Sequence, residues 1–130
     1  MTLRSQTQGI ETDAEPAAVV ALIADGHRIP EWAPGFADRV EGDAQRGWQV
    51  IKGDNDFAVD IRVNHEAGTV DYVREIGPGR TGGACLRAIP RLGGGTVIVV
   101  TLPVLPGTAP EDVAAILTEE LETLARLVAR

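Results

Sequence analysis

The sequence predicts an α+β fold, and three features of its hydropathy pattern support this prediction. From about residue 38 onward, six short segments alternate between apolar and polar residues with a period of two, which is typical of strands. Short turn-like segments rich in glycine separate these strands, and connections of that length favour antiparallel neighbours. Near the C-terminus the apolar residues instead recur at helical spacing.

The N-terminal third predicts one strand and two short helical segments. Residues 2–12 alternate in part between polar and apolar side chains, which indicates a first strand. A helix is expected to begin near Pro16, because proline fits a first turn and the acidic residues beside it favour the helix dipole. Its apolar positions are Val19, Val20, Leu22 and Ile23. Residues 27–36 contain two prolines and a glycine, so they can hold only one or two further helical turns.

The six central strands are predicted over residues 38–41, 47–52, 57–65, 69–76, 83–89 and 95–102. The third of them alternates most cleanly. One of its faces holds Phe57, Val59, Ile61, Val63 and His65. We therefore expect this face to be buried or to line a cavity, and the opposite face to be solvated.

The C-terminal segment predicts a long amphipathic helix of about 20 residues. Thr108 and Glu111 have the spacing of a capping box, with the threonine at the cap position. The apolar stripe consists of Val113, Ile116, Leu117, Leu121, Leu124 and Val128. We interpret this stripe mainly as core.

Length and charge limit the classes of function. With 130 residues, the chain is expected to form a single domain over residues 1–130 with a real hydrophobic core. Its formal net charge of −7 argues against a general nucleic-acid binder and against a polybasic membrane-surface protein. No apolar run is long enough to span a bilayer, and the N-terminus is too polar for a signal peptide. The single cysteine, Cys85, favours a reducing, cytoplasmic location.

Residues 14–36 resemble the opening of the START-like (SRPBCC) superfamily, in particular its polyketide cyclase/dehydrase and lipid-transport group. The matching positions are Pro16, the apolar core and aspartate of residues 19–25, Pro30, Trp32 and Gly35. The predicted strand count and the terminal amphipathic helix match as well. The resemblance covers nearly the whole chain, but these motifs describe fold more than chemistry.

This resemblance implies a helix-grip fold, in which a curved, seven-stranded antiparallel sheet wraps around the C-terminal helix. Such proteins usually enclose a cavity for an apolar ligand between sheet and helix. Members include cyclases, lipid carriers, hormone receptors and chaperone activators, so the fold does not by itself define function. The chain is short for the group, which implies either a smaller cavity or a filled one.

Most standard catalytic machinery is absent from the sequence. The glycines at positions 77, 79 and 82 form a literal G-x-G-x-x-G, but a strand rather than a helix follows, so we interpret it as a turn. Ser5 lacks a nucleophile elbow, and Lys52 is expected to be an ordinary solvated lysine. Cys85 is expected to be a small buried hydrophobe. Two histidines without a Cys-His cluster make a zinc site unexpected, and we expect no metal or cofactor.

The remaining polar candidates lie on two strands. Tyr72 and Arg74 share a face with Val70, and we expect this face to point toward the C-terminal helix. An inward arginine would need a carboxylate partner, because an unpaired buried charge is costly. His65 is either a rim residue or a base on the apolar face of its strand, and His27 is most simply a surface residue near a helix end. Any chemistry must therefore rest on His65, Tyr72, Arg74 or a carboxylate.

Three functions are compatible with these residues. The first is non-catalytic binding of a small apolar or lipid-like molecule. Its predicted cavity walls are Trp32, Phe36, Phe57, Ile61, Tyr72 and Leu117, of which Trp32 is either a core plug or a lid. The second is a cyclase/dehydrase-type enzyme in which Tyr72 donates a proton, Arg74 stabilises an oxyanion and His65 acts as base. The third is a ligand-free interaction module, for which a homodimer through an edge strand is one arrangement.

Overall fold

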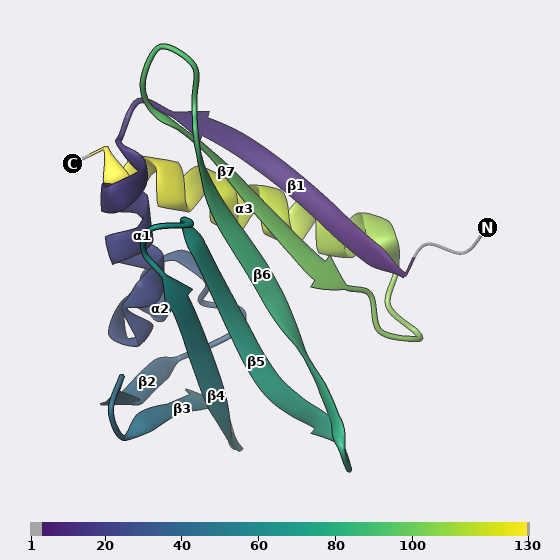
Figure 1. The fold of residues 1–130 in the computed structure, drawn as a ribbon. Helices are drawn as coiled ribbons and strands as arrows, with labels where there is room; N and C mark the ends of the chain where they lie inside the picture. Colours follow the sequence, from purple (N-terminus) through teal and green to yellow (C-terminus); the bar gives the residue numbers. More distant parts are fainter. Residues whose placement is uncertain (1–3, 130) are drawn as a thin grey trace.

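The structure is a computed structural model that describes residues 4–129. The elements, in chain order, are β1 (Ser5–Thr12), α1 (Pro16–Ala24), the 3-10 turn η1 (Gly26–Arg28), α2 (Ile29–Trp32), β2 (Arg39–Asp43), β3 (Gly47–Lys52), β4 (Asn55–Asn64), β5 (Thr69–Gly77), β6 (Arg80–Pro90), β7 (Thr96–Pro103) and α3 (Pro110–Val128). The predicted α+β layout is confirmed: one strand, two short helices, six strands and a long terminal helix (Figure 1).

The seven strands form one antiparallel sheet in the order β1-β7-β6-β5-β4-β3-β2. Strands β2 to β7 follow one another as a meander, because each is joined to the next by a short turn. The first strand then closes the far edge by pairing with β7. This is the curved sheet of the helix-grip fold that the sequence resemblance implied.

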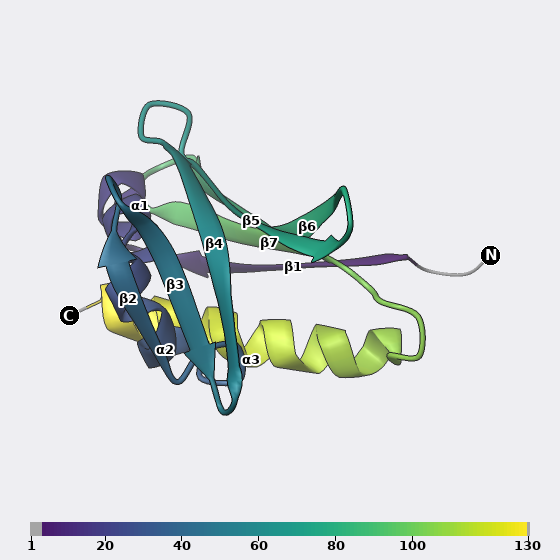
Figure 2. The ribbon, with the colours of Figure 1, turned by 90° about the horizontal axis from the view of Figure 1, so that it is seen from below.

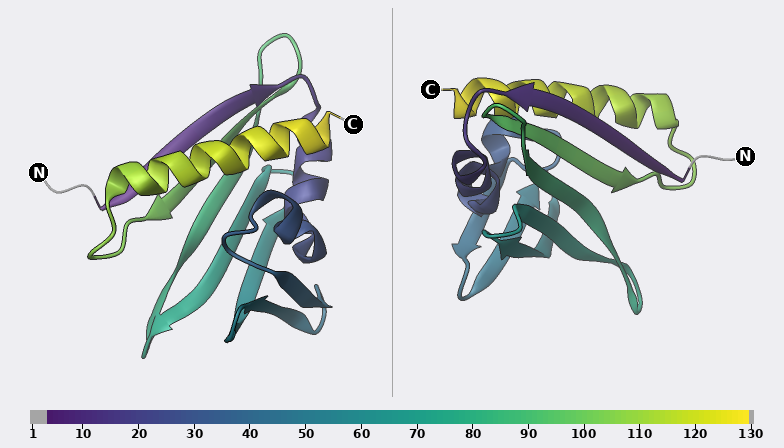
Figure 3. Two further views of the ribbon diagram at one scale, coloured as in Figure 1. Left: turned by 180° about the vertical axis from the view of Figure 1, so that it is seen from behind. Right: turned by 45° about the horizontal axis from the view of Figure 1, so that its top comes forward.

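The long helix α3 crosses the concave side of the sheet and packs mainly along β1 (Figures 2 and 3). Its buried residues are Val113, Leu117, Leu121 and Leu124, which recur at helical spacing. The core between helix and sheet is completed by Ile98 and Val100 of β7 and by Leu86 of β6. The short helices α1 and α2 cover the other end of the same side (Figure 3).

The start of α3 differs from the predicted capping box. The N-cap residue is Ala109, which has no side chain that could accept a hydrogen bond, and Pro110 takes the first helical position. A residue before proline is driven to an extended conformation, and Ala109 has φ −73° and ψ 127°. Thr108 therefore lies one residue too early to cap, and its backbone N–H donates to Leu105 in a turn.

Strand β4 changes partner along its length. Its first half, as far as Val59, pairs with β3, and its second half, from Asp60 onward, pairs with β5. The first half of β4 and the last residues of β5 consequently diverge, as Figure 1 shows at the lower ends of both strands. This divergence leaves space for side chains between two neighbouring strands.

Candidate functional site

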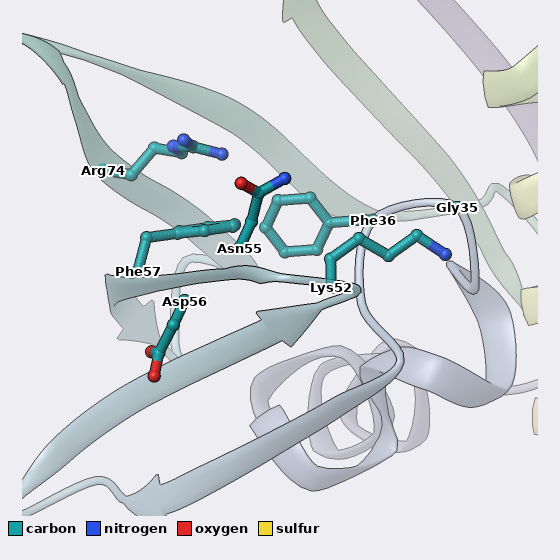
Figure 4. A pocket seen from close by; sticks show the side chains of 7 residues that line it. All are labelled: Gly35, Phe36, Lys52, Asn55, Asp56, Phe57 and Arg74. Atoms are coloured by element: carbon teal, nitrogen blue, oxygen red, sulfur yellow. The ribbon is translucent and has the colours of Figure 1, made fainter.

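A pocket of about 480 Å³ lies where β4 and β5 diverge. It is lined by Gly35, Phe36, Lys52, Asn55, Asp56, Phe57 and Arg74. Figure 4 shows that the side chains of Phe36, Asn55, Phe57 and Arg74 point toward a common space, whereas Asp56 points away from it. The wall on one side is the segment between α2 and β2, and the opposite walls are β4 and β5.

Two aromatic rings form the apolar part of the pocket. The ring centroids of Phe36 and Phe57 are 5.6 Å apart and the ring planes meet at 73°, which is a favourable edge-to-face arrangement. Both residues are partly buried and pack against the hydrophobic core. The pocket therefore has a preformed apolar floor.

Arg74 supplies the charge. Its guanidinium carbon lies 3.7 Å from the centre of the Phe57 ring, and its Nε is buried without a hydrogen-bond partner. Within residues 4–129 Arg74 forms no ion pair, so the expected carboxylate partner is absent. The face of an aromatic ring attracts a cation, and this contact takes the place of the expected partner.

Lys52 is hydrogen-bonded to other groups of the protein, whereas an ordinary solvated lysine was expected. Its Nζ donates hydrogen bonds to the carbonyl oxygen of Pro34 at 2.9 Å and to Oδ1 of Asp38 at 3.0 Å. The other carboxylate oxygen of Asp38 accepts from the backbone N–H of Gly53 at 2.8 Å. This hydrogen bond from Gly53, together with the one from Lys52, lowers the pKa of Asp38.

Three of the predicted cavity walls lie in the packed interior instead of lining this pocket. Trp32, Tyr72 and Leu117 are exposed by only 5%, 6% and 2%. The centroids of Trp32 and Tyr72 are 6.1 Å apart, and the Tyr72 hydroxyl donates to the backbone carbonyl of Ile23. Burial, together with the charge of Glu120, raises the pKa of Tyr72 well above its ordinary value.

Ile61, the remaining predicted wall residue, lines a second depression of about 830 Å³. This depression extends from β2 across β3, β4 and β5 to β6, and it shares Phe57 and Arg74 with the first pocket. The structure thus brings Phe36, Phe57 and Arg74 together at one pocket and separates them from Trp32 and Leu117.

The sequence pattern predicted that His65 lies on the apolar face of a strand, and the structure contradicts this prediction. Strand β4 ends at Asn64, and His65 is an exposed residue of the following turn. Asn64 forms this turn, because its side-chain oxygen accepts from Ala67 and its carbonyl accepts from Gly68, both at 2.9 Å. His65 is therefore absent from the pocket that contains Arg74.

Cys85 is exposed, whereas a buried position was expected. It lies between Ala84 and Leu86 on β6, and the alternation of the strand places it on the face opposite the buried Leu86. Partial burial and the neighbouring Asp71 raise the pKa of its thiol, so the structure does not activate it as a nucleophile. Arg87, on the same strand, pairs with Asp71 at 2.7 Å.

Glu120 is a polar residue that sequence reasoning missed. Burial, with a smaller effect of the neighbouring Glu119, raises its pKa to about 7. Its influence on the pKa of Tyr72 indicates that it lies on the inner side of α3. The available signal was its position between Leu117 and Leu121, at the edge of the apolar stripe.

Neither a metal cluster nor a membrane-crossing helix is found in the described part of the chain. Within residues 4–129 no group of three or more His, Cys, Asp or Glu side chains is arranged to hold a metal ion. The helices there are also too short or too polar to cross a membrane.

Comparison with known proteins gives the fold but no family assignment. No protein-family model matches the chain, and no curated protein matches it. Among solved structures, the Zhui aromatase/cyclase from Streptomyces sp. R1128 is similar with a TM-score of 0.70 at 15% identity, covering 98% of this chain and 94% of that one. The di-domain aromatase/cyclase BexL gives 0.70 at 14% identity, covering 95% of this chain and 46% of that one.

A protein from Chromobacterium violaceum is also similar, with a TM-score of 0.69 at 16% identity and coverage of 98% of both chains. At such identities the likeness establishes architecture alone. The chain has the helix-grip fold, and these aromatase/cyclases are among the proteins that share it.

Proposed function

We propose that the protein binds a small hydrophobic molecule with an anionic or strongly accepting oxygen, in the pocket formed by Phe36, Phe57 and Arg74. The observation that carries this proposal is the unpaired Arg74 guanidinium, which lies against an aromatic ring in an open pocket of about 480 Å³. Pockets of roughly 300–1,000 Å³ are typical of small-molecule sites.

The pocket contains the two components that such a ligand requires. Phe36 and Phe57 offer apolar surface that a flat or aliphatic ligand can cover. The guanidinium offers donors in a planar fork, which suits a carboxylate, a phenolate or a carbonyl oxygen. Lys52 adds positive charge at the same pocket, although its ammonium is already bonded to Asp38. Side chains of the core fill the space beneath α3. The proposed ligand therefore lies outside that core, in the pocket between β4, β5 and the loop that carries Phe36.

A matched pair of fluorescent probes tests this proposal. 1-Anilinonaphthalene-8-sulfonate is an anionic aromatic probe, and N-phenyl-1-naphthylamine has the same ring system without the sulfonate. We expect saturable binding of both probes at one site, with tighter binding of the anionic probe. Phe57→Ala should weaken both, because it removes apolar contact from either ring system. Native mass spectrometry of freshly purified protein would in addition show a carried ligand.

Two controls make the result decisive. Near-ultraviolet circular dichroism must be unchanged in Phe57→Ala, because loosely packed states also bind such probes. Ile89→Ala removes a half-exposed apolar side chain that lines neither pocket, and it should leave both affinities unchanged. Absence of saturable binding in the wild-type protein would contradict the proposal, and so would equal loss in both variants.

A cyclase/dehydrase-type activity is the second candidate, and Glu120 is the observation that favours it. A carboxyl group with a pKa of about 7 suits general acid–base catalysis near neutral pH. The geometry does not favour catalysis by His65, Tyr72 and Arg74 acting together. His65 lies in an exposed turn, and the Tyr72 hydroxyl is hydrogen-bonded to the carbonyl of Ile23. Glu120, which lines neither of the two pockets, would then carry the proton transfer.

Solvent deuterium exchange at the α-carbon of a β-keto thioester, followed by NMR, tests this activity. Catalysed exchange that Glu120→Gln abolishes would support it. The same α-carbon exchange rate with and without wild-type protein would contradict it.

A further inference from the structure

One wall of the proposed site is a short loop that is attached to the sheet by hydrogen bonds of Lys52 and Asp38. Residues 33–38 connect α2 to β2 and bring Gly35 and Phe36 to the pocket. The local backbone hydrogen bonds of this loop are those from the N–H groups of Phe36 and Ala37 to the carbonyl of Ala33, at 3.0 and 3.2 Å. These bonds shape the loop but do not attach it to the sheet.

The attachment to the sheet is made around Lys52, at the end of β3. Its ammonium bonds Pro34 and Asp38 simultaneously, which lie before and after Phe36 in the loop. Asp38 extends the link by accepting from the N–H of Gly53, in the turn that leads to β4. Asp38 also donates its own N–H to the carbonyl of Ile51 at 2.8 Å. We call the hydrogen bonds among Pro34, Asp38, Lys52 and Gly53 the clasp.

We propose that Lys52 is a positioning residue for the pocket, and that its ammonium holds the loop so that Phe36 faces Phe57. This inference rests on the proposed function for its consequence in binding, whereas the link itself is a property of the unliganded chain. Neutralising the ammonium would leave the carbonyl of Pro34 without this donor and remove the charge that attracts Asp38. The loop that carries Phe36 would then open more often.

The position of Lys52 also makes it a modification site with a defined effect. It is the only lysine of the chain, and its side chain is 40% exposed, so an acylating reagent can reach it. Acetylation converts the ammonium to a neutral amide and removes the charged donor. The structure therefore assigns acylation of this single residue a specific outcome, namely a loosened pocket wall.

The experiment combines amide hydrogen exchange with probe binding. Lys52→Met keeps most of the side-chain shape without the charge, whereas Lys52→Arg keeps the charge. Asp38→Asn removes the negative charge that accepts the bond from Lys52, at a residue that does not line the pocket. We expect the amides of Asp38 and Gly53 to exchange about three- to tenfold faster in Lys52→Met and Asp38→Asn than in the wild type. Binding of N-phenyl-1-naphthylamine should weaken by about two- to fivefold in both.

Arg62→Met is the matched control. Arg62 forms a more exposed ion pair with Asp60 at 2.8 Å, and neither residue lines the first pocket or belongs to the clasp, so its loss should change neither readout. Acetylation of the wild-type protein should reproduce Lys52→Met. The same treatment of Lys52→Arg modifies only the N-terminal amine and should leave exchange at Asp38 and Gly53 unchanged.

The two readouts distinguish failure of this inference from failure of the proposed function. Unchanged exchange at Asp38 and Gly53 in Lys52→Met overturns the positioning role, whatever the probe does. If exchange is faster in Lys52→Met but the wild type binds neither probe, the clasp is supported and the proposed site is rejected. A loss of probe affinity in Lys52→Met but not in Asp38→Asn would show that Lys52 contacts the ligand directly, and would overturn the positioning role.

Discussion

The guanidinium carbon of Arg74 lies 3.7 Å from the centre of the Phe57 ring, at a point where their strands are not hydrogen-bonded to each other. Phe57 pairs with Val50 on β3, and Arg74 pairs with Gly82 on β6. The contact between the two side chains therefore spans the opening of the sheet. It places a positive charge without a carboxylate partner on an aromatic surface inside a pocket, which is the arrangement that the proposed ligand would use.

The first prediction concerns the charge of Arg74. In Arg74→Met, affinity for 1-anilinonaphthalene-8-sulfonate should fall about tenfold or more, because a charge-assisted contact is lost. Affinity for the uncharged N-phenyl-1-naphthylamine should change little, since methionine retains much of the apolar stem. Fluorescence titrations of both probes measure the difference. If both affinities fall equally, Arg74 acts through packing alone and the anionic preference is rejected.

The second prediction concerns the buried hydroxyl of Tyr72. Tyr72→Phe should lower the free energy of unfolding by about 1–3 kcal/mol, because the carbonyl of Ile23 loses its side-chain donor in a buried place. Probe binding should remain unchanged, since Tyr72 does not line the pocket. Urea unfolding and fluorescence titration measure the two effects. A loss of binding without a loss of stability would place Tyr72 at the ligand instead.

The single tyrosine of the chain allows an independent check of the same burial. The pKa of Tyr72 is raised by burial, so tyrosinate absorbance should not develop near its ordinary value of about 10 while the protein stays folded. Absorbance near 295 nm, recorded together with circular dichroism, should show ionisation only as the protein unfolds. Reversible ionisation of the folded protein near pH 10 would contradict the buried hydroxyl.

The sequence predicted the sheet well because alternation reports directly on which side chains face the core. On β5, for example, alternation assigns Val70 and Tyr72 to one face and Asp71 to the other, and the structure buries Val70 and Tyr72. Alternation contains no information on which strand a given half of β4 pairs with. The opening at Phe57 and the pocket it creates were for that reason not predictable from the pattern.

The site residues illustrate the same limit. His65 continues the alternation of Phe57 and Ile61, yet Asn64 ends the strand because its side chain forms a turn with Ala67. Arg74 was expected to need a carboxylate, but an aromatic ring from another strand compensates it, and no local pattern reveals that ring. Glu120 lies at the edge of an apolar stripe, where only the three-dimensional packing determines how much of a side chain is buried.

The third prediction concerns Gly83 on β6. Its φ of 154° lies in the region that favours glycine, and a Cβ at this position would lie 1.6 Å from the carbonyl oxygen of Tyr72. Gly83→Ala should therefore destabilise the protein by about 2 kcal/mol or more, because the backbone between β5 and β6 must move. Gly9→Ala is the control, since a Cβ there meets only ordinary contacts at 3.5 Å or more. Equal midpoints of thermal unfolding for both variants would contradict the close approach.

The last prediction concerns the pH dependence of stability that Glu120 contributes. Its pKa is about 7 in the folded protein and near 4.5 in the unfolded chain, so the folded state holds this proton more tightly. The contribution of Glu120 to the free energy of unfolding is therefore fully present below about pH 4.5. It declines as the pH rises and is lost once the pH passes 7. Glu120→Gln removes this dependence, because the amide stays neutral at every pH. The variant should unfold with a free energy close to that of the wild type at pH 4 and about 1–3 kcal/mol higher at pH 8.

Urea unfolding of both proteins at pH 4, 6 and 8 measures this difference directly, and taking the difference cancels the titration of the other carboxylates. Glu122→Gln, an exposed residue of the same helix, is the control and should track the wild type throughout. A constant difference between Glu120→Gln and the wild type across this range would mean that Glu120 is solvated in the folded protein. In that case it could serve neither as a buried acid nor as the general base of the second candidate function, since both depend on its proton being held near neutral pH.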